Sequence, residues 1–170
     1  MLSLLVLSAV FGGCATPANY EGMVPPVIET EKKHPQTVSA MVTGGKETDT
    51  IGKSQISDTA FAQALTEAIT QSKTFSRVVQ GKGADYLLTV IIFSMDQPNF
   101  GLSFTVKMEA GWMLKRVENG QTVWRESIKS EHTATIGDAF VGATRLRLAT
   151  EGAAKNNIAQ GLAEISKLNL

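Results

Sequence analysis

Apolar residues occupy every second position of the stretch Leu102-Ser-Phe-Thr-Val-Lys-Met-Glu-Ala-Gly-Trp-Met-Leu114. The residues between them are polar or small, apart from Met113. This period of two is typical of a β-strand with one face on a core and the other near water. The residues expected in the core are Phe104, Val106, Met108 and Leu114, and those expected at the surface are Thr105 and Lys107.

The flanking sequence extends this strand into a β-meander over residues 84–130. Residues 86–93 are apolar at almost every position, which suits a strand covered on both faces. A turn at 97–101, containing Pro98 and Gly101, separates the first two strands. Asn119-Gly120 is a strong hairpin signal and leads into a third strand over 122–129.

Two helices and two further strands are expected around the meander. Residues 37–43 alternate as a first strand, and 75–79 form a short one. Ser57 or Asp58 can cap a helix over 58–72, and Asp138 can open a long helix over 138–167. The glycines of the second helix either bend it or let it lie close to the sheet. The sequence therefore predicts an α+β domain, with a mostly antiparallel sheet of four to five strands, two helices packed on it and the order β-α-β-β-β-β-α.

Composition excludes several classes of function. Lysine and arginine together number 16, as do aspartate and glutamate, so the formal net charge is zero. A neutral chain lacks the electrostatic footprint of a nucleic-acid or anionic-lipid binder. Its 6% of aromatic residues argues against a base-stacking surface. Because Cys14 is the single cysteine, an internal disulfide and a cysteine zinc site are excluded.

The N-terminus is expected to be a targeting segment. Residues 2–10 are almost wholly apolar, too few to span a bilayer but matching the apolar region of a signal peptide. The following Phe11-Gly12-Gly13-Cys14 resembles a bacterial lipobox, which implies cleavage before Cys14 and its lipidation. Phe11 stands where the lipobox prefers leucine, and Ala15 resembles the outer-membrane-directed class. The alternative is a buried apolar segment with an incidental thiol.

The expected domain organisation follows from this targeting segment. Residues 1–13 are a lipoprotein signal peptide, 14–37 a lipidated cysteine and tether, and 38–170 a single α+β domain. The tether contains Pro17, Pro25, Pro26 and Pro35, and Pro-rich polar sequence forms extended spacers. Pro25-Pro26-Val27 could instead dock a partner.

A search for chemistry finds no catalytic constellation. Ile51-Gly52-Lys53-Ser54 lacks the upstream glycine of a phosphate-binding loop, because that position is Glu47. His34 falls in the tether and His132 at a strand end, without the spacing of a zinc site. The carboxylates are scattered singly. We therefore expect no enzyme, with no catalytic, cofactor-binding, metal-binding or nucleotide-binding residues and no nucleic-acid partner.

Four large or charged side chains are assigned to structure rather than function. Trp112 and Trp124 are expected in the core or on a sheet face. Arg145 and Arg147 could meet an acidic partner, although such pairs more often form a solvated face. Glu151 precedes Lys155 at the spacing of a helical ion pair.

Three segments in order, Ala60-Phe-Ala-Gln-Ala-Leu65, Phe75-Ser-Arg-Val78 and Ala84-Asp-Tyr-Leu-Leu88, resemble small Gram-negative envelope lipoproteins. The domain is similar to the TolB N-terminal domain, to LpoB, and to auxiliary lipoproteins of MCE-type lipid transporters. The resemblance rests on packing positions, so it implies a fold and carries over no functional residue. It also implies a non-enzymatic role in binding another envelope protein.

The expected function combines these observations. The protein is predicted to be an outer-membrane lipoprotein on the inner leaflet facing the periplasm, bound to the membrane through Cys14. It would serve as an interaction module in cell-envelope biogenesis or maintenance. The alternative is an auxiliary subunit of a lipid-transport system, which requires an exposed apolar groove. If a partner binds the sheet, an edge strand is the natural place.

Overall fold

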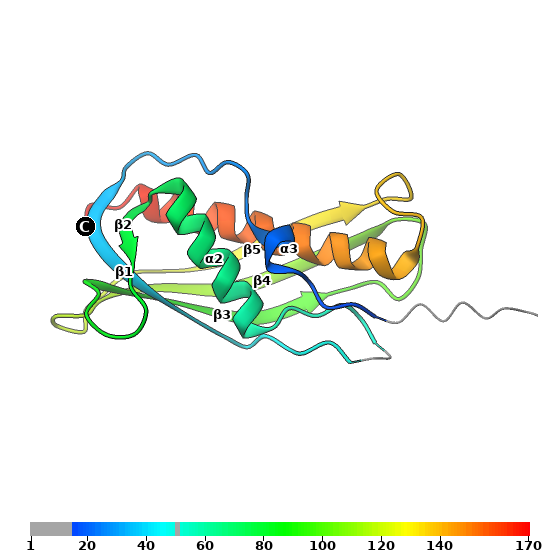
Figure 1. The fold of residues 1–170 in the computed structure, drawn as a ribbon, viewed down its shortest axis with the longest axis horizontal. Coiled ribbons are helices and arrows are strands. Elements are labelled where there is room, and N and C mark those ends of the chain that lie inside the picture. Colours follow the sequence, from blue (N-terminus) through cyan, green and yellow to red (C-terminus); the bar gives the residue numbers. More distant parts are fainter. Residues whose placement is uncertain (1–14, 50–51) are drawn as a thin grey trace, which may run out of the picture.

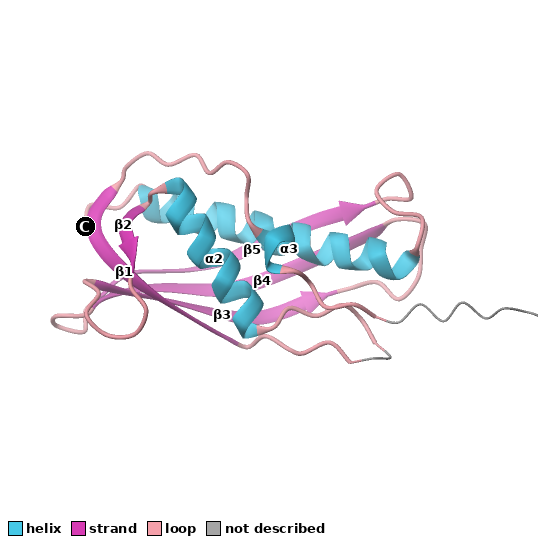
Figure 2. Cartoon of the chain, viewed as in Figure 1, coloured by secondary structure: helices cyan, strands magenta, loops and turns pink. Residues whose placement is uncertain are grey.

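One five-stranded sheet, covered on one face by helices, forms the protein (Figures 1 and 2). The computed structural model describes residues 15–49 and 52–170. In chain order the elements are α1 (Tyr20–Met23), β1 (His34–Thr43), α2 (Asp58–Ser72), β2 (Phe75–Val78), β3 (Tyr86–Asp96), β4 (Phe104–Arg116), β5 (Thr122–Ala134) and α3 (Gly142–Ser166).

The strands are arranged in the order β2-β1-β3-β4-β5. β3, β4 and β5 form the antiparallel meander, whereas β1 runs parallel to both of its neighbours. The α+β class is thus confirmed, and most residue pairings are antiparallel, but the sheet is mixed. The structure also differs from the expected order by a third helix, α1, at the start of the described chain.

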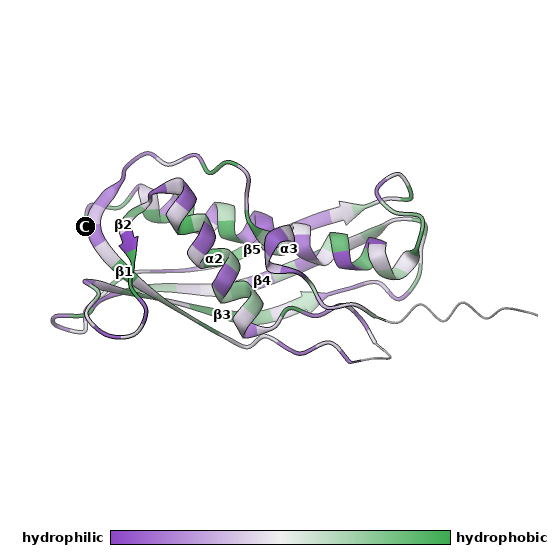
Figure 3. Cartoon of the chain, in the orientation of Figure 1, coloured by the Kyte–Doolittle hydropathy of each residue, from purple (hydrophilic) through white to green (hydrophobic). Residues whose placement is uncertain are grey.

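Alternation along β4 sets the two faces of the sheet. Phe104, Val106, Met108 and Leu114 are buried, whereas Thr105 and Lys107 are exposed, as predicted. The buried face of β4 packs against α3, whereas α2 packs over β1 and β2. Hydrophobic and hydrophilic residues alternate along both helices, as expected of helices with one face on a core (Figure 3).

The helix α2 has the predicted bounds, and its ends show why. Ser57 is the N-cap, and its hydroxyl accepts a hydrogen bond of 3.1 Å from the Ala60 N–H. Lys73 ends the helix in the left-handed conformation, with φ of 56°. Both signals are local in sequence.

The helix α3 begins at Gly142 rather than Asp138. The carboxylate of Asp138 instead accepts hydrogen bonds of 2.7 and 2.8 Å from the N–H and hydroxyl of Thr135. This makes a turn before the helix. The helix then runs unbroken to Ser166, with the Trp112 ring over Gly161 and the His132 ring over Gly152. The glycines therefore let the helix lie close to the sheet.

The segment expected as a tether is packed onto the domain. Ala18 and Met23 are buried, and the Ala18 N–H donates to the Gln55 carbonyl at 3.0 Å. His34 is buried at the start of β1, where its Nε2 donates to the Ile165 carbonyl at 3.0 Å. The packed structure thus includes residues well before position 38. Cys14 and the predicted signal peptide lie outside the described residues.

Within residues 15–49 and 52–170, no helix is both long and apolar enough to cross a bilayer.

Candidate interaction surface

The residues considered for chemistry are engaged in structural contacts. The Lys53 ammonium donates to the Gln97 carbonyl, so it holds two loops together. His132 is exposed on β5, where its ring packs over Gly152. Across residues 15–49 and 52–170, no group of three histidine, cysteine or acidic side chains is placed to hold a metal ion.

The sheet face opposite the helices carries a groove, which we call the sheet groove. It has a volume of about 520 Å³ and is lined chiefly by Thr89, Ile91, Phe93, Gly111, Met113 and Arg125. Ile91 is 40% exposed and Phe93 is 58% exposed. Large apolar side chains with this exposure on a flat sheet are unusual without a partner.

Phe93 lies at a β-bulge on the floor of the sheet groove. The alternation of β3 places Ile91 and Phe93 on the open face, and the register shift between Ile92 and Ser94 adds Ser94 to the same face. The Phe93 ring lies directly over Gly111, where a side chain would clash with it. The glycine therefore lets an aromatic ring lie flat on the sheet at this point.

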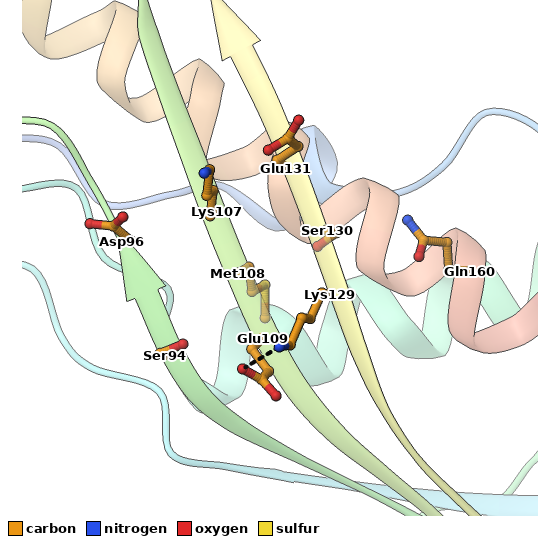
Figure 4. A pocket seen from close by; sticks show the side chains of 9 residues that line it. All are labelled: Ser94, Asp96, Lys107, Met108, Glu109, Lys129, Ser130, Glu131 and Gln160. Atoms are coloured by element: carbon orange, nitrogen blue, oxygen red, sulfur yellow. Dashed lines mark ion pairs between the residues drawn. The ribbon is translucent and has the colours of Figure 1, made fainter.

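Charged side chains cover the adjoining part of the same face, which we call the charged half (Figure 4). Strand register places Lys107 between Asp96 and Glu131, and the Lys129 ammonium lies 3.8 Å from the Glu109 carboxylate. A hollow of about 540 Å³ lies among these residues. Exposed pairs of this kind contribute little stability. The positive and negative side chains alternate across the strands, so this part of the face presents a defined charge pattern beside the apolar sheet groove.

The two edges of the sheet are β2 and β5. The edge strand β2 has only four residues. On the other edge strand, β5, the carbonyls of Ile128 and Glu131 accept hydrogen bonds of 3.0 and 2.8 Å from Asn157 and Asn156 of α3. Because alternate residues direct their carbonyls to opposite sides, the Ile128 carbonyl faces β4 and only the Glu131 carbonyl lies on the open edge, where a partner strand would need it. The open face carries the sheet groove as well, so it is the candidate surface.

Sequence reasoning missed the role of Arg145. Expected on a solvated face, it is only 6% exposed, and its guanidinium lies 5.1 Å from the centre of the Phe104 ring. It donates hydrogen bonds of 2.8 and 2.9 Å to the carbonyls of Ala139 and Phe140, and one of 3.3 Å to that of Gly101. Every residue has a backbone carbonyl, so the sequence does not show which carbonyls Arg145 will contact. Its hydrogen bonds could therefore not be predicted from the sequence.

Glu151 is a second buried charged group with an unexpected partner. It pairs with Arg147 at 2.7 Å rather than with Lys155, and it accepts a hydrogen bond of 2.8 Å from the Asn19 N–H. The carboxylate therefore fastens the N-terminal segment to α3.

Comparison with known proteins shows a shared fold. No protein-family model matches the sequence, and no curated protein matches it. The protein XCC0632 from Xanthomonas campestris is 13% identical with a TM-score of 0.62, covering 85% of this chain and 92% of its own. The dodecameric PelC from Paraburkholderia phytofirmans is 12% identical with a TM-score of 0.54, covering 84% and 92%. A minor lipoprotein from Acinetobacter baumannii is 10% identical with a TM-score of 0.53, covering 79% and 93%.

These likenesses concern the fold alone, because each identity is far below the level at which function transfers. The α+β arrangement of this chain therefore also occurs in a bacterial lipoprotein. The predicted similarity to TolB N-terminal and LpoB domains stays a prediction.

Proposed function

We propose that the protein is a cell-envelope lipoprotein that binds another envelope protein through the open face of its sheet, without catalysis. The observation that carries this proposal is the sheet groove beside the charged half. An apolar centre with a polar and charged border is the usual anatomy of a protein interface. The exposed Ile91 and Phe93 would supply the apolar contact.

The location proposed is the periplasmic side of the outer membrane, with lipidated Cys14 as the anchor. The lipobox-like Gly12-Gly13-Cys14 supports it, as does the occurrence of this fold in a minor lipoprotein. Two or more acyl chains give stable anchoring where one is marginal. Replacing Cys14 with serine should release the protein from the membrane fraction or block its processing. Unchanged mass and fractionation would contradict the anchor.

Site-specific crosslinking tests the binding face. A photoreactive residue at Ile91 or Met113 should capture a partner from intact envelopes, whereas one at Gln71 on the exposed side of α2 should not. Ile91→Lys should abolish capture from position 113, and Gln71→Lys should leave it unchanged. Equal capture from both faces, or none at all, would refute the assignment. Capture of a second copy would instead indicate a homo-oligomer, the state in which PelC was crystallised.

The second candidate function is an auxiliary role in lipid transport, which the apolar groove favours. The groove would then hold part of an acyl chain against Phe93 and Met113. Mass spectrometry of organic extracts from the purified protein should then recover lipid. Its recovery should fall in Ile91→Lys.

A further inference from the structure

Two loops at one end of the molecule expose large apolar side chains. They join β3 to β4 and β5 to α3 (Figure 1). Phe100 is 87% exposed and Phe140 is 88% exposed. We call these residues and their exposed apolar neighbours the apolar tip, which comprises Phe100, Leu102, Ile136, Phe140 and Val141.

Arg145 holds the two loops of the apolar tip together. Its guanidinium donates to Gly101 of one loop and to Ala139 and Phe140 of the other, from a buried position against Phe104. The turn between Thr135 and Asp138 shapes the second loop further. The exposed aromatic rings are therefore carried on backbone that buried contacts fix in place.

The N-terminal end of the described chain lies at this same end of the molecule (Figure 1). Ala18 is hydrogen-bonded to Gln55, and the neighbouring Ser54 carbonyl accepts a hydrogen bond of 2.6 Å from Gln97, where the first loop begins. Only two residues, Thr16 and Pro17, separate Ala15 from Ala18. The chain that precedes Ala15, with Cys14 next to it, is thus attached beside the apolar tip.

The chemistry of the apolar tip fits a bilayer surface. In the loops 97–103 and 135–141 the single charged residue is Asp138, whose carboxylate is engaged with Thr135. Loops that bear phenylalanine, leucine and valine and a single charge gain free energy when their apolar side chains enter the boundary between headgroups and acyl chains. Without lysine or arginine in these loops, the contact does not depend on anionic lipid.

We infer that the apolar tip inserts into the lipid bilayer that holds the anchor, with Phe100 and Phe140 as the leading side chains. The inference rests on the proposed function only for the identity of that membrane. The tip lies at one end of the long axis of the molecule (Figure 1). Insertion therefore stands the sheet away from the bilayer, with its open face turned sideways toward the periplasm.

Depth-dependent fluorescence quenching tests the insertion in the full chain. A polarity-sensitive fluorophore is attached through Phe100→Cys or Phe140→Cys, and through Asn119→Cys in the turn between β4 and β5 as the control. The protein is reconstituted in vesicles of phosphatidylethanolamine and phosphatidylglycerol that contain acyl-chain spin labels. Quenching should be strong at 100 and 140, absent at 119, and unchanged by added salt.

A matched variant separates insertion from mere proximity. With the fluorophore attached through Leu102→Cys, the double substitution Phe100→Ser and Phe140→Ser should shift the insertion equilibrium by about tenfold or more. Met41→Ser, which alters an exposed apolar residue on the open sheet face, should leave quenching unchanged. Thermal unfolding should be the same in all these variants, because the substituted side chains are exposed.

Insertion and anchoring are measured separately: fluorescence quenching reports the insertion, and the mass of the N-terminal peptide reports whether Cys14 is lipidated. If Cys14 is lipidated but positions 100 and 140 are as unquenched as 119, the insertion is refuted and the anchor stands. If Cys14 is unmodified, the fluorophores are placed in the Cys14→Ser background. In that background, quenching at positions 100 and 140 supports insertion of the apolar tip without a lipid anchor. Absence of quenching at both positions refutes the insertion as well as the anchor.

Discussion

Gly161 marks a very close approach between α3 and the sheet. A Cβ atom at this position would lie 2.6 Å from the ring of the fully buried Trp112. Alanine gains about 1 kcal/mol over glycine in a helix, whereas overpacking a dense core costs about 1–3 kcal/mol. We expect Gly161→Ala to lower the free energy of unfolding by up to about 2 kcal/mol, measured by urea denaturation.

Gly142 provides the matched control in the same helix. The nearest atoms to a Cβ built there lie 3.9 Å away, which is ordinary contact. Gly142→Ala should therefore be neutral or stabilising by up to about 1 kcal/mol. Equal stability of the two alanine variants would show that α3 can shift away from Trp112.

Asn157 links the same tryptophan to the edge strand. Its Oδ1 accepts a hydrogen bond of 2.9 Å from the Trp112 Nε1–H, and its Nδ2 donates to the Ile128 carbonyl. Asn157→Ala leaves the buried Trp112 Nε1–H unpaired and removes a donor from the Ile128 carbonyl, so we expect a loss of about 1–3 kcal/mol in urea denaturation. Asn156→Ala, at a more exposed contact, should cost less than about 1 kcal/mol. A larger cost at 156 would contradict this ranking.

At the scale of elements, the turn before α3 is sensitive to acid. Hydrogen bonds from the Thr135 backbone and side chain hold the pKa of Asp138 below its ordinary value. A carboxyl group whose pKa is lowered by folding stabilises the turn above its ordinary pKa, about 4, and the effect is lost as pH falls through the folded pKa. The protection of the amides over 135–141, measured against their intrinsic exchange rate at each pH, should therefore fall at acid pH.

Asp138→Ala isolates this carboxylate. In the variant, exchange over 135–141 should be fast at neutral pH and should show no further step on acidification beyond the intrinsic rate. A Glu118→Ala control in the exposed turn between β4 and β5 should keep the acid response. Persistence of the step in Asp138→Ala would assign it to another group.

Arg145 couples two loops, so its removal should loosen both at once. Arg145→Ala deletes the donors to Gly101, Ala139 and Phe140. We expect faster hydrogen exchange across 99–103 and 138–141, while Lys155→Ala in the same helix changes neither. Faster exchange in only one loop would show that the other is held by its own turn.

The elements that sequence predicted well are those with local signals. The bounds of α2 follow from Ser57 and an apolar stripe, and the faces of β4 follow from a period of two. The parallel direction of β1 depends on pairing with β3, about fifty residues away, which no local pattern encodes. The sequence predicted that Asp138 begins α3, but it lies in the turn before the helix. Aspartate suits a turn as well as a helix cap, so its identity alone does not distinguish the two.

The candidate surface was less predictable than the fold. The alternation in β4 indicated an outward face, but the groove also needs the Phe93 ring to lie over Gly111 of the neighbouring strand. The sequence pointed to an edge strand for a partner that binds the sheet, whereas Asn156 of α3 occupies an acceptor on the β5 edge. Such features depend on how whole elements approach one another.

For the whole molecule, packing of the N-terminal segment governs how far the domain can stand from a membrane anchor. A free tether over 15–33 could extend by about 3.3–3.6 Å per residue. With Ala18 and Met23 buried and Asn19 bonded to Glu151, only the residues before Ala18 remain as spacer. The domain of an anchored chain is therefore held close to the bilayer, as contact by the apolar tip requires.

Glu151→Ala should release this segment and lengthen the tether. The substitution removes the acceptor of the Asn19 N–H and the partner of Arg147, at a cost of about 1–3 kcal/mol. In anchored protein, energy transfer from a donor attached through Asn119→Cys to an acceptor in the bilayer should fall and broaden, because the domain can move outward. Glu164→Ala, which removes an exposed pair with Lys167, should leave the transfer unchanged. Unchanged transfer in Glu151→Ala would mean that buried contacts such as Met23 hold the segment without the carboxylate.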